Sequence, residues 1–366
     1  MSLWWFQISS LFRRLKLDWP LLIMLLLLLG VGLIVLYSAS GRILFVERQG
    51  FRIGLGLLAL LVLAHIDPRF FRTWSLPLFL AGLVLLVMVL VMGTGAMGAK
   101  RWLGIPGLLM FQPAEIMKIA VPAMLAWWVT RAELPPRLGA LGVATLCILL
   151  PAFLVVQQPD LGTAILLIAS GFFVLFLAGI SRWILVLSGL SLLATLPLLW
   201  LGVLREYQKQ RILTLFNPQS DPLGAGWNII QSKTALGSGG WSGKGYLQGT
   251  QSQLEFLPES HTDFVLSVMG EEFGFIGLLL LLCLYLAITL RALWLSAQAR
   301  DTFGRILGGA LSLVFFLYVL VNVGMVSGIL PVVGVPLPMI SYGGTSLVTL
   351  LASFGIIMSV GAHSAR

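Results

Sequence analysis

Ten stretches of this chain consist almost entirely of apolar residues and are long enough to cross a lipid bilayer. A helix of about 20 apolar residues spans the hydrocarbon core, so runs of this length indicate membrane helices. The sequence therefore predicts an all-α integral membrane protein, a single polytopic domain over residues 1–366. About ten transmembrane helices are expected, near residues 19–38, 50–66, 75–93, 110–129, 139–156, 161–180, 183–203, 264–290, 305–326 and 342–361.

The composition supports this prediction and excludes several classes of protein. Only 10% of the residues are charged, whereas soluble domains carry about 25%. The net charge of +9 is explained by basic cytoplasmic loops. Because no basic run is interleaved with aromatic residues outside the spans, we predict no nucleic-acid partner. Cys147 and Cys283 lie in apolar runs and the three histidines are scattered, so neither a disulfide framework nor a zinc site is expected.

Basic residues at the ends of the apolar runs predict the orientation. Arg13, Arg14 and Lys16 precede the first run, which is too long for a typical signal peptide and is interpreted as a retained helix. Lys and Arg are concentrated in the segments that lie inside if the N-terminus is cytoplasmic. With an even number of spans, both termini are then cytoplasmic.

The longest polar stretch, 205–262, separates the seventh and eighth predicted spans and is expected to be a large extracytoplasmic loop. Loops of this length in compact proteins are usually functional. Its segment 227–230 is apolar enough to form a short amphipathic helix at the membrane surface. No internal repeat is evident, which disfavours transporters built from inverted repeats.

A glycine-rich segment, 237–245, lies within this loop. It resembles a phosphate-binding loop, but Ser238 stands where that motif needs glycine, and Gly245 follows Lys244 where it needs Ser or Thr. Two interpretations remain: a flexible surface loop, or a loop that binds phosphate through its backbone N–H groups.

Charged residues also lie at the ends of predicted spans. Glu115 and Lys118 are three residues apart, so they share one helix face and form either an internal ion pair or part of a polar cavity. Asp160 precedes the sixth span, where an aspartate is a good helix cap.

Three prolines in 331–338 predict a rigid, partly re-entrant segment that lines a cavity or is buried in protein.

Asp263 ends the long loop and precedes the eighth span. Ser260 and Asp263 have the spacing of a capping box, so helix capping is one interpretation. The other is catalytic, because a carboxylate at the membrane surface could reach a lipid-linked substrate. The surrounding stretch is the most acidic in this basic protein and also contains His261. Its acidic residues are Glu255, Glu259, Asp263, Glu271 and Glu272.

These motifs resemble those of the SEDS family (shape, elongation, division and sporulation) over nearly the whole chain. The matching segments are 100–102, 111–115, 158–163, 221–233, 249–259, 261–264 and 337–344. The run Gly249–Phe256 is similar to the branch that acts in cell elongation. One departure is Ala114, where a small hydroxyl residue is expected.

The resemblance implies a peptidoglycan glycosyltransferase of the bacterial cytoplasmic membrane that polymerises lipid II on its outer face. It implies that Asp263 is the catalytic residue, and a carboxylate could act as general base on the acceptor sugar hydroxyl, with a polyprenyl diphosphate as leaving group. No cofactor is required, a divalent cation (Mg or Mn) is possible, and its site is unknown. The implied partners are a class B penicillin-binding protein and other membrane proteins of the elongation complex. The candidate substrate and cavity residues are Arg48, Lys100, Arg101, Glu115, Lys118, Asp160, Lys233, Lys244, Glu259 and His261.

Two other functions remain open. A lipid II flippase would use Glu115 and Lys118 as part of a polar path through the membrane. A non-catalytic scaffold would recruit the elongation machinery, and replacing Asp263 would then matter little.

Overall fold

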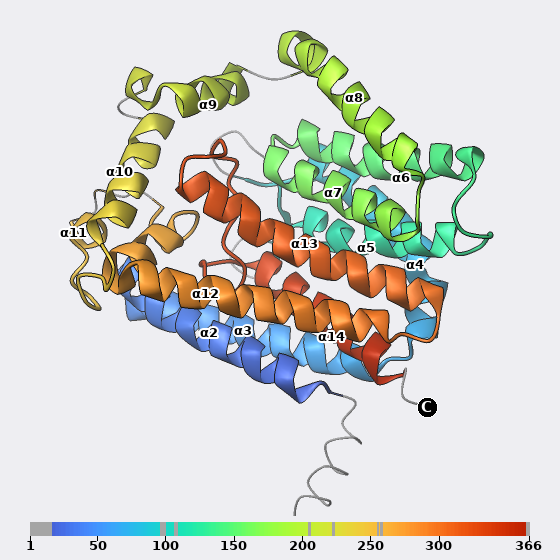
Figure 1. Cartoon of the computed structure of the whole chain (residues 1–366), viewed down its shortest axis with the longest axis horizontal. Coiled ribbons are helices and arrows are strands. Elements are labelled where there is room, and N and C mark those ends of the chain that lie inside the picture. Colours follow the sequence, from blue (N-terminus) through green and yellow to red (C-terminus); the bar gives the residue numbers. More distant parts are fainter. Residues whose placement is uncertain are drawn as a thin grey trace, which may run out of the picture.

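The structure is a computed structural model that describes residues 17–95, 100–105, 109–203, 206–221, 224–254, 256 and 259–363. A helix forms over each of the ten predicted apolar stretches, so the all-α prediction is confirmed (Figure 1). These helices are α2 (Trp19–Ser40), α3 (Ile43–His65), α4 (Pro68–Met92), α5 (Pro113–Val129), α6 (Leu138–Gln157), α7 (Leu161–Leu177), α8 (Arg182–Leu198), α12 (Val265–Ala297), α13 (Thr302–Val326) and α14 (Thr345–Ala362). Arg13, Arg14, Lys16 and Glu255 lie outside the described residues.

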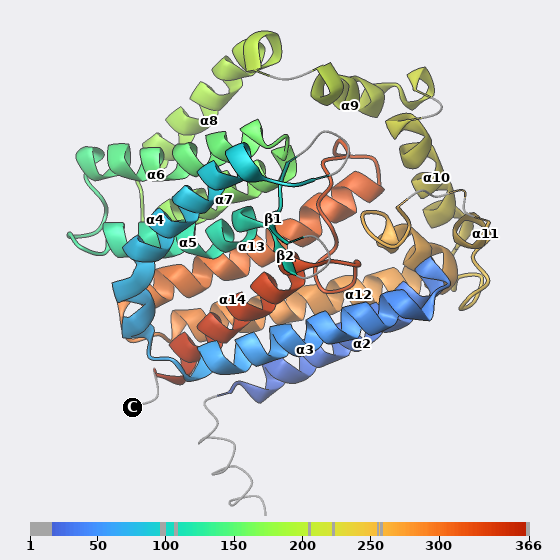
Figure 2. The same ribbon diagram turned by 180° about the vertical axis from the view of Figure 1, so that it is seen from behind.

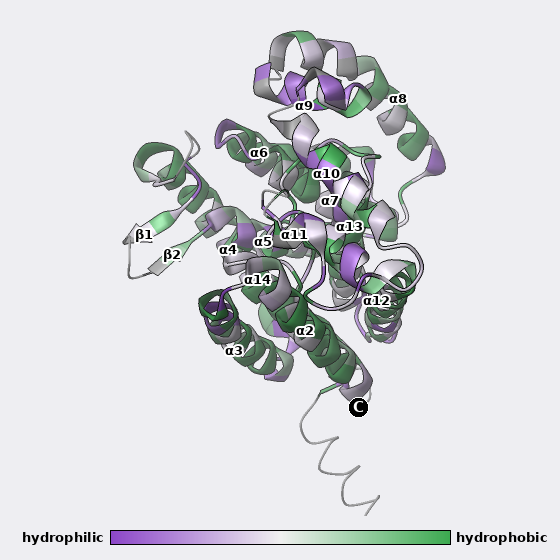
Figure 3. Ribbon diagram, turned by 90° about the vertical axis from the view of Figure 1, so that its left-hand side faces the viewer, coloured by the Kyte–Doolittle hydropathy of each residue, from purple (hydrophilic) through white to green (hydrophobic). Residues whose placement is uncertain are grey.

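Not all of these helices have the composition of a simple membrane span. Within the described ranges, seven are long and apolar enough to cross a membrane, namely α2, α4, α6, α8 with its extension to Gly202, α12, α13 and α14. Helix α7 is apolar but has only 17 residues. Helices α3 and α5 carry charged side chains, which lowers their hydropathy. Figure 3 shows apolar residues along most of the helices and polar residues concentrated in α9 and the loops.

Aspartates determine where four of the helices begin. The side chains of Asp18, Asp67, Asp160 and Asp301 accept backbone N–H groups in the first turns of α2, α4, α7 and α13. Each cap satisfies a donor that the helix leaves unpaired.

The predicted starts of two spans were too late: α3 begins at Ile43 rather than at 50, and α4 begins at Pro68 rather than at 75. Charged residues lie within the first two turns of both helices and lower the local hydropathy, so the apolar runs start later than the helices.

The segment before α5 differs from the sequence prediction. Residues 103–105 and 109–111 form an antiparallel hairpin of β1 (Leu103–Ile105) and β2 (Leu109–Phe111). The fourth helix therefore starts at Pro113, not at 110, because proline suits the first helical position and has no N–H to offer a strand. Arg101 and Trp102 immediately precede β1.

Helix α5 occupies the centre of the bundle. It packs against α4, α6, α7, α13 and α14, and most of its residues are buried. Helices α3 and α14 also approach closely, since a β-carbon at Gly355 would lie 2.6 Å from the carbonyl oxygen of Leu60. Figure 2 shows α14 beside α3. Close approach through small residues is a common way for membrane helices to associate.

The long loop is largely helical. It contains α9 (Glu206–Phe216), the short 3-10 turn Pro218–Ser220, α10 (Ala225–Ser238) and α11 (Thr250–Gln253), which follow one another along one edge in Figure 1. Helix α10 includes the predicted amphipathic segment and packs on α12. Helix α8 stands apart from the bundle in Figures 1 and 2, and none of its described side chains is buried.

The glycine-rich segment 239–245 has a structural role. Helix α12 is interrupted at Gly274, whose φ is 66°. The amides of Lys244 and Gly245 donate to two α12 carbonyl oxygens, both at 3.0 Å, and two α12 amides donate to carbonyl oxygens of the segment. A β-carbon at Gly243 would lie 2.1 Å from the carbonyl oxygen of Glu272, so only glycine fits. These two N–H groups are therefore used within the protein and are not available to a phosphate.

Candidate active site

A cavity of about 230 Å³ lies where the long loop meets the bundle. It is bounded by the segment before β1, the first turns of α5 and α7, the turn before α12, the middle of α13 and the segment that leads into α14. Its lining residues are Arg101, Trp102, Gln112, Glu115, Lys118, Asp160, Thr163, Leu166, Thr262, Asp263, Tyr318 and residues 334–336 and 342–346. Five of the residues predicted from the sequence therefore meet in one cavity.

Asp263 is half-buried in the wall of this cavity. The capping box does not form, because Phe264 is the N-cap of α12 and no side chain caps that end. Instead, the Ser260 hydroxyl donates to the carbonyl oxygen of Ala39 at 3.1 Å, and the Thr262 hydroxyl donates to the Glu259 carboxylate at 2.6 Å. The Asp263 carboxylate makes no hydrogen bond with the described residues, which leaves it able to accept a proton from a ligand.

The surroundings of Asp263 raise its pKa to about 6, chiefly because burial disfavours the charged form and secondly because the Glu259 carboxylate is near. The positive charges of Arg211 and Arg101 oppose this rise, and the Asp160 carboxylate adds to it. A general base is most effective when its pKa is close to the working pH. This carboxylate would be mostly ionised at neutral pH and still a better base than an ordinary aspartate.

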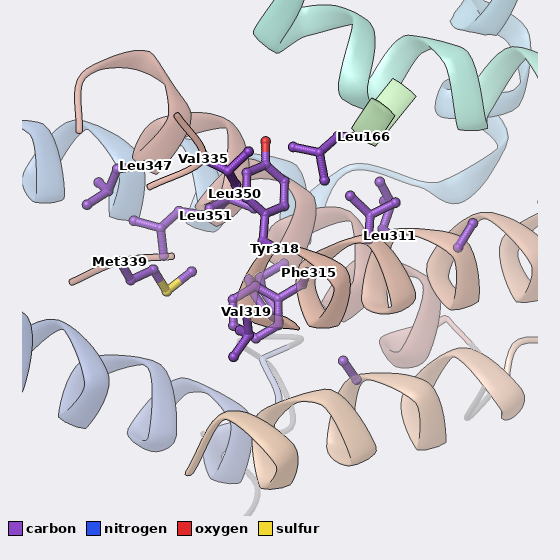
Figure 4. Close-up of a cluster of buried hydrophobic side chains, with 14 of the residues drawn as sticks. Leu166, Leu311, Phe315, Tyr318, Val319, Val335, Met339, Leu347, Leu350 and Leu351 are labelled. Carbon is purple, nitrogen blue, oxygen red and sulfur yellow. The ribbon is translucent and has the colours of Figure 1, made fainter. Parts of the chain in front are cut away.

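Glu115 and Lys118 form an ion pair at the floor of the cavity. Lys118 Nζ lies 2.6 Å from Glu115 Oε1, and the two side chains are only 7% and 6% exposed. Both residues also line the cavity, so the ion pair and the polar cavity, which the sequence analysis offered as alternatives, are both present. Lys118 Nζ also lies 4.9 Å from the ring centre of Tyr318. Figure 4 shows the Tyr318 hydroxyl pointing between Leu166 and Val335, both of which line the cavity.

Arg101 and Asp160 form the opposite wall. Arg101 Nη1 lies 3.8 Å from Asp160 Oδ2, and its Nε donates to the carbonyl oxygen of Gln158 at 3.2 Å. Asp160 also accepts the side-chain amide of Gln112 at 2.9 Å and caps α7 through the N–H of Thr163 at 3.1 Å. The predicted cap is thus confirmed, and the same carboxylate forms an ion pair with Arg101 at the cavity.

The remaining predicted site residues lie outside the cavity lining. His261 packs beside it, against the rings of Phe45 and Tyr342 at centroid distances of 5.0 and 6.1 Å. Glu259 lies on the turn that carries Asp263. Lys244 is paired with the fully buried Glu271 at 2.7 Å, beside the interruption of α12. The other three, Arg48, Lys100 and Lys233, are exposed.

The structure adds residues that sequence reasoning missed. Trp102, Gln112, Tyr318 and Tyr342 line the cavity. Arg211, on α9, donates to the carbonyl oxygen of Val332 at 2.9 Å, and its charge acts on Asp263. An arginine in an amphipathic loop helix gives no sequence signal of this kind. Within the described ranges, no group of three or more His, Cys, Asp or Glu is placed to hold a metal ion.

The chain is similar to known proteins over almost its whole length. Residues 19–366 match a family model described as the cell cycle protein family FtsW/RodA/SpoVE. The chain is 50% identical to the peptidoglycan glycosyltransferase MrdB of Escherichia coli strain K12 over 351 residues, which cover 96% of this chain and 95% of the relative. It is 36% identical to the stage V sporulation protein E of Bacillus subtilis over 362 residues, 95% of this chain and 97% of the relative.

Solved structures of similar chains support the same family relationship as the sequence comparisons. A chain from a study of polymerization and crosslinking by a peptidoglycan synthase complex aligns with a TM-score of 0.84 at 30% identity, covering 96% of this chain and 99% of that chain. The crystal structure of the rod shape determining protein RodA of Thermus thermophilus aligns with a TM-score of 0.72 at 30% identity, covering 96% and 98%. The cavity, the motifs and these similarities lead to one assignment: this chain belongs to the FtsW/RodA/SpoVE family, the SEDS family that its sequence resembles.

Proposed function

We propose that this chain is a peptidoglycan glycosyltransferase that polymerises lipid II during cell elongation. One observation carries the proposal: Asp263, a carboxylate with a raised pKa and no hydrogen bond among the described residues, opens into a cavity that also contains Arg101 and Lys118. The names of the relatives support the reaction class. The cavity therefore brings a candidate base and candidate cations together.

In the proposed step, the acceptor sugar's 4-hydroxyl oxygen attacks the anomeric carbon of the donor. Asp263 removes the hydroxyl proton as the new glycosidic bond forms, a role typically worth about 10²–10⁴-fold in rate. The bond between the anomeric carbon and the phosphate oxygen breaks, and the polyprenyl diphosphate leaves with the electron pair. The diphosphate bond supplies the driving force, so ATP is not needed.

The leaving group requires positive charge, because two phosphates develop negative charge as the bond breaks. Arg101 is the best-placed cation, since its guanidinium is about one-third exposed at the cavity rim. Lys118 is neutralised by Glu115 and is better suited to shaping the floor. No cofactor is needed in this scheme. A divalent cation, if used, would arrive bound to the substrate diphosphate and add charge there.

We further propose that all ten helices cross the bacterial cytoplasmic membrane and that both termini are cytoplasmic. The amphipathic α9 and α10, the glycine-rich segment and the cavity lie toward one end of the bundle, and this common location supports the proposal that lipid II binds and reacts at the outer face. The polar positions in α3 and α5 support spans that face the cavity rather than lipid, since charges at this depth normally face protein or water.

Cysteine labelling tests this orientation. In a chain with Cys147 and Cys283 replaced by Ala, Thr234→Cys on α10 should react with a membrane-impermeant maleimide added to intact spheroplasts. Ser181→Cys, which precedes α8 at the other end of the bundle, is the matched control and should react only after the membrane is permeabilised. Both native positions are exposed in the structure. The reverse labelling pattern would contradict the orientation.

A crosslinking partner is also proposed. The similar chain with a TM-score of 0.84 comes from a study of a synthase complex that joins polymerization to crosslinking. A strand made at the outer surface must be crosslinked close to where it emerges. We therefore propose that a class B penicillin-binding protein, together with other membrane proteins of the elongation complex, binds this chain.

Polymerisation by the purified chain tests the function. Detergent-solubilised protein given lipid II should produce glycan chains longer than one disaccharide, resolved by gel electrophoresis. A flippase, which the ion pair at the cavity floor would also suit, would move lipid II across vesicle membranes without producing chains. A scaffold would do neither, and absence of polymer both alone and with the transpeptidase would count against the proposal.

A further inference from the structure

A buried amide on α13 joins the two segments that flank the candidate base. Asn322 is 0% exposed, and its Nδ2 donates to the carbonyl oxygen of Asp263 at 3.0 Å and to that of Val335 at 2.9 Å. Two carbonyl oxygens face the same end of the side chain, which establishes that the NH₂ group points toward them. Both hydrogens of that group are therefore used on the backbone next to the cavity.

We infer that Asn322 is a positioning residue for the glycosyl transfer, which holds Asp263 against the wall formed by residues 334–336. The inference rests on the proposed function, because it assigns to Asn322 the placement of the proposed base. Asn322 does not line the cavity among the described residues, so it does not act on the substrate itself.

The backbone around Asp263 needs this support. Asp263 lies in a turn between the long loop and α12, and its side chain has no hydrogen bond among the described residues to orient it. Opposite it, Gly334 has a φ of 72°, and a β-carbon there would lie 3.7 Å from Asp263 Oδ2. The 334–336 wall and the Asp263 turn belong to different parts of the sequence. In the described structure, Asn322 is the side chain whose hydrogen bonds connect both of them to α13.

Packing alone is a weaker explanation for Asn322. Asparagine commonly joins membrane helices by hydrogen bonds, but here both acceptors are backbone atoms of the cavity wall rather than atoms of a neighbouring helix. The Oδ1 atom has no hydrogen-bond partner in the described structure. Leaving a buried acceptor unpaired costs about 1–3 kcal/mol, so a residue selected only for stability would be better replaced by an apolar one.

The test compares variants of the purified enzyme on lipid II. Asn322→Leu keeps the branched shape and the number of side-chain heavy atoms but has no donors, so the turn and the wall lose their shared hydrogen bonds. We expect kcat to fall by about 10–100-fold, as small misplacements of a reacting group do, with a much smaller change in KM. Ser312→Ala is the matched control: Ser312 is buried on the same helix, but its hydroxyl bonds only within it. Its activity should be near that of the unmodified enzyme.

The pH dependence of kcat separates positioning from general loss of structure. Charged groups that face Asp263 are Glu259 on its own turn, Arg211 on α9, Arg101 and Asp160 on the opposite wall, and the Glu115–Lys118 pair at the floor. A base must be ionised, so the unmodified rate should fall as the pH drops through about 6. Loosening the turn in Asn322→Leu hydrates the carboxylate, and the midpoint should move down by about half a unit or more.

Each result decides the inference. A reduced kcat with a lowered midpoint supports it. Unchanged activity overturns it, and so does activity that falls only in proportion to the folded fraction with an unmoved midpoint. If Asn322→Leu does not fold, Asn322→Ala removes both donors without adding a charge beside Asp263, and the same criteria apply. If the unmodified chain makes no polymer, the proposed function fails instead, so the two failures are distinguishable.

Discussion

Replacing Asp263 by Asn should abolish polymerisation while leaving the protein folded. Asparagine keeps the shape of the side chain but cannot accept the proton of the acceptor hydroxyl, so the rate should fall by about 10²–10⁴-fold. Since the half-buried carboxylate caps no helix and its charged form is disfavoured by burial, the neutral amide should not lower the melting temperature at neutral pH. Gel analysis of the products and thermal unfolding in detergent measure the two effects.

Glu259→Gln is the matched control for that experiment. Glu259 lies on the same turn, and its carboxylate accepts the Thr262 hydroxyl rather than opening into the cavity. Its replacement removes a negative charge that raises the pKa of Asp263, so the acid limb of the rate profile should move to lower pH while clear activity remains. Near-normal polymerisation by Asp263→Asn would show that another group is the base.

The largest loss of stability should follow from replacing one member of the Glu115–Lys118 pair. Lys118→Met leaves the Glu115 carboxylate buried without its cation, and breaking a buried pair in this way typically costs about 3–5 kcal/mol. The double replacement Glu115→Gln with Lys118→Met removes the stranded charge and should be more stable than Lys118→Met alone. A double-mutant cycle of unfolding free energies, or of inactivation rates in detergent, gives the coupling energy.

The chain contains a control pair with the same spacing. Glu206 and Lys209 on α9 are also three residues apart and 2.8 Å from each other, but Glu206 is 89% exposed. Exposed helix pairs of this kind contribute about 0.2–0.5 kcal/mol, so Lys209→Met should have little effect. Equal losses for the two pairs, or simple additivity at Glu115 and Lys118, would contradict a direct buried ion pair.

Much of the fold could be predicted from local sequence patterns. The apolar runs located a helix at every expected place, because lipid-facing and core-facing residues in a membrane protein are both apolar. Pro113 and Asp160 marked the starts of α5 and α7 through capping rules that involve only neighbouring residues. The starts of α3 and α4 and the hairpin before α5 were missed, because helical turns with charged residues and short strands do not form apolar runs of spanning length.

The candidate site was predictable only in part. Asp263, Glu115, Lys118, Arg101 and Asp160 were identified by family motifs and by the cost of charge near the membrane, and the structure brings all five to one cavity. Lys244 lies in the glycine-rich segment for which phosphate binding remained one of two interpretations, yet its side chain pairs with Glu271. A pattern over nine residues cannot distinguish a ligand-binding loop from one that completes an interrupted helix.

The sequence by itself determined a helical membrane protein, the order of its helices and the identity of the acidic residue at the head of α12. These properties depend on hydropathy, capping and motifs, which act between residues close together in the chain. Only the tertiary structure decided that Asp263 is not a helix cap, that Arg211 acts on it from α9, and that Asn322 connects its backbone to Val335. Those contacts join segments far apart in the chain, and their energies depend on distance and burial, which no local pattern of residues encodes.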